Sequence, residues 1–84
     1  MENKKEIIAG IIVIGNEILS GRTQDTNTST LSIWLNSLGI KVQEVRVIPD
    51  IEKKIVDTVN DFRKQFNYVF TTGGIGPTHD DITA

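Results

Sequence analysis

The chain contains no cysteine, and it has only one histidine, one tryptophan and two prolines among its 84 residues. Without cysteine it forms no disulfide bond and no thiolate metal site, which is compatible with a reducing cytoplasm. It also lacks a long hydrophobic run, because the apolar segment Ile7 to Ile14 is too short for a membrane span and no small-residue cleavage site follows it. We therefore expect a cytoplasmic protein with no membrane partner.

A concentration of charge of one sign is absent as well. The formal net charge is −2, and the basic residues are scattered in pairs rather than arranged in a stripe. Such a distribution does not neutralise many phosphates of a nucleic acid, so we expect no nucleic-acid partner. Hydrophobic residues make up 38% and charged residues 24%, which is typical of a folded globular protein. The length suits one domain at most.

The first half of the chain predicts a strand followed by a helix. The run Ile7 to Ile14 has no polar alternation, which is typical of a central parallel strand covered on both faces, and Gly10 allows close packing of a helix. The next apolar residues recur at helical spacing; they are Leu31, Trp34, Leu35 and Leu38. Leu31, Trp34 and Leu35 are predicted to lie in the core. Asp25 or Asn27 is expected to cap this helix, and Gly39 to end it.

The second half predicts a strand, a helix and a third strand. Residues 41–48 are apolar with three charged members, which indicates an edge strand. Pro49 ends this strand, and Asp50 is expected to cap the following helix. One apolar face marks that helix, formed by Ile51, Ile55, Val59, Phe62 and Phe66. Residues 68–72 form the third strand and lead directly into a glycine-rich segment.

The β-α-β-α-β order predicts a three-layer α/β/α fold with a parallel sheet. Strands that are joined through helices are parallel, and the crossovers are right-handed. The most apolar strand belongs in the centre, which gives the strand order 2-1-3 with the helices on opposite faces. The chain steps from strand 1 to one side and then back past strand 1 to the other side. This reversal of direction creates a crevice beyond the carboxyl ends of strands 1 and 3, where ligands bind in open α/β sheets. Residues 15–25 and 73–81 flank it, and Asp50 lies along the same edge.

The glycine-rich segment at residues 73–81 is the first candidate site. Gly73, Gly74 and Gly76 leave backbone N–H groups free to face one hollow, and a helix start near Asp81 would add positive potential for an anion. Thr72 and Thr78 offer hydroxyl donors. The alternative is that the glycines only permit a turn.

The charged residues of the same segment point to a cation. Asp80 and Asp81 have the same sign as a phosphate, so a Mg²⁺ ion, or another divalent metal, would have to bridge the carboxylate and phosphate oxygens. Asp81 is equally explained as a helix cap. His79 is either a surface residue of the loop or a group for proton transfer.

The segment after the first strand is the second candidate site, and it is expected to be a polar loop. Arg22 offers a planar fork for phosphate or carboxylate, and Ser20 and Gly21 leave space beside it. The alternative is a surface Arg22 that forms an ion pair with Glu17.

Three motifs carry a family resemblance. GNEILSGR at residues 15–22, D-T-N at residues 25–27 and TTGGIGPTHDDIT at residues 71–83 resemble the molybdopterin-binding domain of CinA (competence/damage-inducible) proteins. MoaB and Mog proteins of molybdenum cofactor biosynthesis share this domain. The resemblance covers nearly the whole chain, so residues 1–84 are expected to be a partial domain of this kind.

The resemblance implies a domain that binds a phosphorylated nucleotide or pterin and breaks a pyrophosphate bond. In the Mog-like branch the reaction is adenylyl transfer from Mg-ATP to molybdopterin, and in the CinA-like branch it is metal-dependent cleavage of ADP-ribose. Gly73, Gly74 and Gly76 would hold phosphates, while Asp81 and Asp50 match the acidic catalytic positions. The remaining ligand-binding positions implied by the motifs are Gly15, Glu17, Ser20, Gly21, Arg22, Asn27, Thr72 and Thr78.

The family domain is about twice as long as this chain. A three-stranded sheet with an uncovered third strand is a poor stand-alone fold. We therefore expect either a homo-oligomer or completion by a further C-terminal part. A non-catalytic binding module and an inactive remnant remain alternatives to the enzyme.

Overall fold

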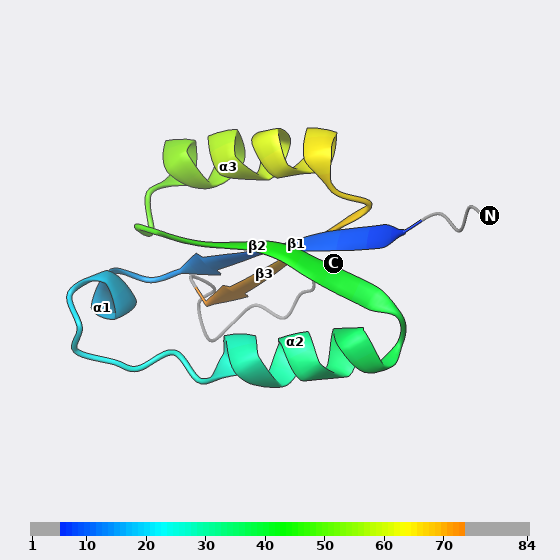
Figure 1. The fold of residues 1–84 in the computed structure, drawn as a ribbon. Helices are drawn as coiled ribbons and strands as arrows, with labels where there is room; N and C mark the ends of the chain where they lie inside the picture. Colours follow the sequence, from blue (N-terminus) through cyan, green and yellow to red (C-terminus); the bar gives the residue numbers. More distant parts are fainter. Residues whose placement is uncertain (1–5, 74–84) are drawn as a thin grey trace.

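A computed structural model describes residues 6–73 of the chain as a three-layer α/β/α sandwich. Its parallel strands are β1 (Ile7–Ile14), β2 (Ile40–Ile48) and β3 (Tyr68–Gly73). They lie in the order β2-β1-β3, and α2 (Asn27–Ser37) and α3 (Glu52–Gln65) cover opposite faces of the sheet (Figure 1). The predicted fold class and strand order are confirmed.

The central position of β1 follows from its composition. From Ala9 to Ile14 every residue of β1 is buried, because β2 and β3 pair with its two edges and a helix covers each face. The core on the α3 side contains Ile12, Ile14, Ile48, Phe62 and Phe66. The core on the α2 side contains Ile11, Val13 and Leu35. As predicted, the charged strand β2 lies at an edge.

Gly10 allows α3 to approach the sheet closely. A Cβ atom built on Gly10 would lie 2.5 Å from a ring carbon of Phe62 and 2.7 Å from one of Phe66. The two rings themselves meet edge to face, with centroids 5.0 Å apart. The aromatic end of α3 therefore fills the space that a side chain at position 10 would need, which confirms the predicted role of this glycine.

The prediction that Leu31, Trp34 and Leu35 all lie in the core was wrong for Trp34. Leu35 is buried and Leu31 packs beside it, but Trp34 is 54% and Leu38 is 56% exposed. A helix that lies on a sheet buries only the residues along its line of contact. Trp34 and Leu38, four residues apart, share a flank of α2 that nothing among the described residues covers.

The helix ends agree only in part with the predicted caps. The Asp25 Oδ1 atom accepts the backbone N–H groups of Asn27 at 3.1 Å and Thr28 at 3.3 Å, so Asp25 caps α2. Gly39 has a φ of +84°, as expected for the residue that ends this helix. The predicted Asp50 cap of α3 was wrong. The helix begins only at Glu52, its N-cap is Ile51, and no side chain caps it. The N–H of Asp50 donates to Asn16 Oδ1 at 3.1 Å.

The segment after β1 was expected to be a loop but contains one helical turn, α1 (Asn16–Leu19). Its Ile18 packs against the core on the α2 side, which explains why a polar segment folds back onto the sheet. In the part of the chain that the structure describes, no helix has the length and apolar character needed to cross a membrane.

Candidate functional site

A cavity of about 230 Å³ lies at the carboxyl ends of β1 and β3, where the topology predicts a crevice. Val13 and Ile14 form its floor from β1, and Thr72 and Gly73 border it from β3. The rest of the lining comes from α1 and from the segment that connects α1 to α2; these residues are Glu17, Ile18, Thr23, Gln24, Asp25, Thr26 and Asn27. The cavity is therefore built mainly from strand ends and the connection after them.

Gly73 lies at the border of this cavity with a φ of +76°. L-residues with a side chain rarely adopt that conformation. A Cβ atom at this position would also overlap the carbonyl oxygen of Ile14. The backbone of β3 thus passes so close to the end of β1 that only glycine fits. This geometry supports, for Gly73, the alternative that the glycine is there because the backbone requires it, whether or not a ligand binds beside it.

Glu17 organises the connection that forms the outer wall. Its backbone carbonyl accepts the N–H groups of Arg22 at 3.0 Å and Thr23 at 3.2 Å, together with the Ser20 hydroxyl at 3.2 Å. Its side chain lies over Gly15, where an added Cβ would be 3.0 Å from the Glu17 Oε2 atom. The motif GNEILSGR therefore forms a compact turn that presents one carboxylate at the cavity.

Asp25 fixes the start of α2 beside the cavity. In addition to the two backbone bonds to its Oδ1 atom, its Oδ2 atom accepts the Thr28 hydroxyl. Both carboxylate oxygens are thus used within the helix cap. Asp25 thereby positions Thr26 and Asn27 in the wall of the cavity.

The structure brings together some of the predicted ligand-binding residues. Glu17, Asn27, Thr72 and Gly73 line the cavity. The residues Gly15, Ser20, Gly21, Arg22 and Asp50 do not line it. Arg22 is exposed, and the alternative ion pair between Arg22 and Glu17 is not present among the ion pairs of residues 6–73. Gly74, Gly76, Thr78, His79, Asp80 and Asp81 lie outside the described residues.

Thr23, Gln24 and Thr26 line the cavity but were not predicted as site residues. Their signal in the sequence is a run of hydroxyl and amide side chains between Arg22 and the start of α2. Such side chains donate hydrogen bonds without adding charge, and this suits the oxygens of a polar ligand.

Within residues 6–73, no three side chains of aspartate, glutamate, histidine or cysteine come together. Of the two acids that line the cavity, Asp25 is committed to its helix cap. The predicted metal ligands Asp80 and Asp81 are beyond the described part, so the expectation of Mg²⁺ stays a prediction.

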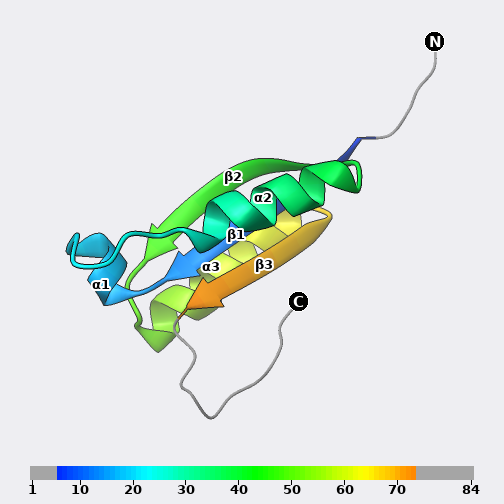
Figure 2. The same cartoon turned by 90° about the horizontal axis from the view of Figure 1, so that it is seen from below.

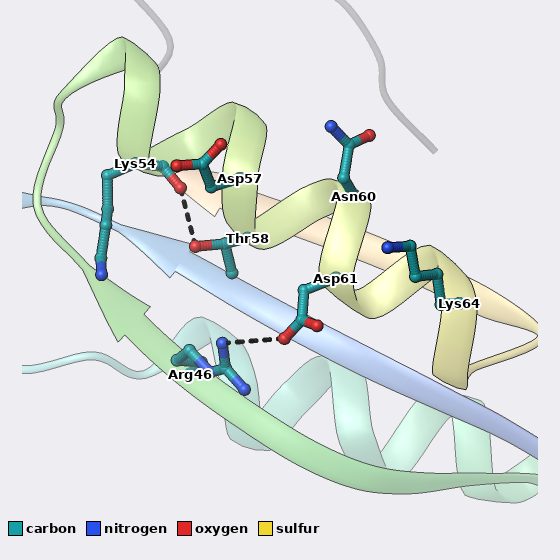
Figure 3. Close-up of a pocket in the computed structure, with 7 residues that line it drawn as sticks. All are labelled: Arg46, Lys54, Asp57, Thr58, Asn60, Asp61 and Lys64. Carbon is teal, nitrogen blue, oxygen red and sulfur yellow. Dashed lines mark hydrogen bonds and ion pairs between the residues drawn. The ribbon is translucent and has the colours of Figure 1, made fainter.

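A larger cavity of about 410 Å³ lies between β2 and α3 (Figure 3). Arg46 donates to Glu44 at 2.8 and 3.1 Å and to Asp61 at 3.5 Å, and its guanidinium lies 4.8 Å from the centre of the Phe62 ring. The hydrogen bond to Glu44 raises the pKa of Arg46 above its usual value. Arg46 pairs with Glu44 on its own strand and with Asp61 on α3, and so it joins β2 to α3. We therefore interpret Arg46 as a structural residue of this surface.

The family model described as "Probable molybdopterin binding domain" matches residues 10–84. The chain is 45% identical to a "Probable FAD synthase" of Caenorhabditis elegans over 89% of its own length and 14% of that protein. It is 42% identical to a "CinA-like protein" of Amoebophilus asiaticus over 87% of its length and 18% of that protein.

Two solved structures share the fold. The protein CinA from Thermoplasma acidophilum superposes with a TM-score of 0.79 and 34% identity, over 84% of this chain and 42% of that one. The "tungsten cofactor synthesizing protein MoaB" from Pyrococcus furiosus superposes with a TM-score of 0.74 and 23% identity, over 90% of this chain and 48% of that one. At 23% identity the second likeness concerns the fold alone. The chain spans less than half of each of these four proteins.

Proposed function

This chain belongs to the family of probable molybdopterin binding domains, of the CinA and MoaB type, and on that premise we propose that its cavity at the ends of β1 and β3 binds a phosphorylated pterin or nucleotide. The observation that carries the proposal is the position of the cavity. Glu17 and Ile18 from the motif at residues 15–22, and Thr72 and Gly73 from the start of the motif at residues 71–83, line it together although they are far apart in the sequence. Ligands of open parallel sheets bind at this place.

The chemistry of the lining suggests how the ligand is oriented. Thr23, Thr26, Asn27 and Thr72 offer hydroxyl or amide donors for phosphate oxygens. Glu17 is negatively charged at neutral pH and repels a phosphate that lies next to it. The phosphate is therefore expected near Thr72 and Gly73, with the uncharged ring toward the wall that carries Glu17.

The names of two relatives agree with a ligand of this class. The Caenorhabditis relatives are called "Probable FAD synthase", and FAD is a dinucleotide joined through a diphosphate. The family's cleavage of a pyrophosphate bond with a divalent metal would require Asp50, Asp80 and Asp81 in addition to the cavity. For this chain we propose the binding of such a ligand rather than its cleavage. A binding module without turnover is the second candidate, because the chain spans only 42% and 48% of the solved relatives.

Calorimetric titration of the folded chain with ATP, ADP-ribose and molybdopterin, each with and without Mg²⁺, tests the proposal. Thr72→Val and Asn27→Ala remove donors from the cavity and should each weaken binding by about ten- to a hundredfold, since a lost hydrogen bond to a charged group costs about 1.5–3 kcal/mol. Lys54→Ala is the matched control, because Lys54 lines the other cavity and lies on α3. Weaker binding in Lys54→Ala with no effect of Thr72→Val would move the site to the surface between β2 and α3.

The reaction products distinguish the enzyme from the module. With Mg²⁺, release of pyrophosphate from ATP in the presence of molybdopterin, as the adenylyl group passes to molybdopterin, or release of AMP and ribose 5-phosphate from ADP-ribose, supports the family chemistry. Binding without any of these products supports a module. A chain with a folded circular dichroism spectrum that binds none of the three ligands would contradict the proposal and leave the inactive remnant.

A further inference from the structure

Glu17 differs from the other polar residues that line the ligand cavity. Most of these residues are uncharged; they are Thr23, Gln24, Thr26, Asn27 and Thr72. Asp25 is charged, but both of its carboxylate oxygens are occupied by the cap of α2. Within residues 6–73 Glu17 accepts hydrogen bonds only through its backbone oxygen, and its carboxylate takes part in no ion pair. In the described part of the lining, Glu17 therefore has the one carboxylate with both oxygens open to a ligand.

The position of this carboxylate follows from the fold. Glu17 lies on α1, which follows the tip of β1 at the end of the sheet where β3 also ends (Figure 2). A Cβ atom built on Gly15 would lie 3.0 Å from Oε2 and 3.3 Å from Oε1 of Glu17. The missing side chain at position 15 thus lets both oxygens lie close to the backbone. The turn therefore places a pair of acceptor atoms at the wall of the cavity.

The floor of the cavity is apolar. Val13 and Ile14 come from β1, and Ile18 adds an aliphatic side chain next to Glu17 in the sequence. Ligand sites combine apolar surface, on which a flat ring packs, with a few polar groups that fix its orientation. A ring that lies on Val13 and Ile14 presents its polar edge to the wall of the cavity. Glu17 is then the group that meets that edge.

The chemistry of a carboxylate restricts which ring edge fits. An ionised carboxylate only accepts hydrogen bonds, and its two oxygens match two adjacent N–H groups. Pterins and guanine have such a pair, because a ring N–H lies beside an exocyclic amino group. Adenine instead places a ring nitrogen with a lone pair beside its amino group, and a flavin places its ring N–H between two carbonyl oxygens. In both of these rings an acceptor faces the carboxylate, which is unfavourable.

We propose that Glu17 selects the ring of the ligand by accepting both N–H groups of the 2-amino-4-oxopyrimidine ring that pterins and guanine share. This inference rests on the proposed function, since it needs the phosphate of the ligand near Thr72 and Gly73. Adenine and flavin rings are rejected, because a site built to accept hydrogen bonds discriminates strongly against a ligand that lacks the donors. Glu17 is in this view a specificity residue and takes no part in bond cleavage.

Three nucleotides that differ only in the ring test the proposal by calorimetric titration without metal. GMP carries both donors, inosine monophosphate lacks only the 2-amino group, and AMP presents the adenine edge. We expect GMP to bind about ten- to a hundredfold more tightly than inosine monophosphate, the value of one hydrogen bond to a charged group. AMP should bind more weakly than either. Neopterin phosphate carries the same donor pair as GMP, so the tighter binder of the two identifies a pterin or a purine nucleotide as the natural source of the ring.

Glu17→Gln keeps the size of the side chain and the backbone carbonyl that holds the turn. A hydrogen bond to a neutral amide is about half as strong as one to a carboxylate, so a tenfold preference for GMP over inosine monophosphate should fall to about threefold. AMP should gain relative to GMP, since glutamine matches one donor and one acceptor of adenine. Glu52→Gln is the control, because it removes an exposed carboxylate from α3, outside the cavity, and should leave the preference unchanged.

The ratio of affinities is the readout because the lost negative charge strengthens the binding of every phosphate alike. Equal affinities for the three nucleotides in the unaltered chain would overturn the selection of the ring but not the proposed function, provided that Thr72→Val still weakens all of them. Absence of binding would overturn both. If Glu17→Gln weakens all three nucleotides equally, and only when Mg²⁺ is added, Glu17 holds a cation and does not contact the ring.

Discussion

Gly73 passes the carbonyl oxygen of Ile14 so closely that a methyl group at position 73 would overlap it. The same glycine has a φ of +76° and borders the ligand cavity. Two requirements, conformation and space, thus coincide at the point where β1 and β3 end. The geometry of the cavity depends on both strands keeping this contact, because the cavity is bounded by residues of each strand end.

Gly73→Ala should therefore destabilise the protein more than an alanine at another glycine with positive φ. Gly39→Ala is the control, since its φ is +84° and no heavy atom lies within 4 Å of its Cβ position. The left-handed conformation alone costs about 1–2 kcal/mol, which both variants share. The additional loss in Gly73→Ala, measured by urea unfolding, reports the overlap with Ile14. Equal losses of unfolding free energy in the two variants would show that the end of β3 can move away from Ile14 without destabilising the protein.

Gly10→Ala should also destabilise the fold, through the contact with Phe62. An added methyl 2.5 Å from the ring forces a shift in a packed core, which costs about 1–3 kcal/mol. Phe62→Leu makes room, so the double variant should be more stable than the sum of the two single changes predicts. A double-mutant cycle of unfolding free energies measures this coupling. Additive losses would mean that Phe62 is not what the methyl meets.

The sequence predicted the sheet correctly because its signals are local. The unbroken apolar run of β1 predicts a strand buried on both faces, and the charges of β2 predict an edge. From these two features follow the strand order and the position of the crevice. The motifs then indicated Glu17, Asn27, Thr72 and Gly73, all of which line the cavity.

The wrong predictions concern residues whose surroundings come from distant parts of the chain. The burial of Trp34 depends on how far the sheet extends beneath α2, and helical spacing does not give that width. The turn before α3 is held by Asn16, which accepts the N–H of Asp50 from 34 positions earlier, and the helix begins only at Glu52. No local pattern reports such contacts.

Asp25→Ala should lower the unfolding free energy by about 0.5–2 kcal/mol, the usual effect of removing a helix cap. Asp25→Asn keeps one oxygen acceptor and should lose less. Asp57→Ala is the control on the other helix, because the exposed Asp57–Lys53 ion pair at 3.0 Å contributes at most about 0.5 kcal/mol. Thermal unfolding followed by circular dichroism compares the three variants. A loss in Asp57→Ala as large as that in Asp25→Ala would contradict the assignment of the cap.

Arg46→Ala should cost about 1 kcal/mol, the combined effect of partly exposed ion pairs and a cation–π contact. Because its partners, Glu44 first, raise the pKa of Arg46, its contribution does not change between neutral pH and pH 9 and is lost on the alkaline side only as the pH rises through the raised pKa. The difference in unfolding free energy between the unaltered protein and Arg46→Ala should thus be the same at pH 7 and pH 9. It should shrink in high salt, which screens the pairs with Glu44 and Asp61 but leaves the contact with Phe62. Arg46→Lys keeps the charge but loses the planar group, so it should recover less than the full difference. If Arg46→Lys is as stable as the unaltered protein, charge alone joins β2 to α3, and the guanidinium geometry has no part in it.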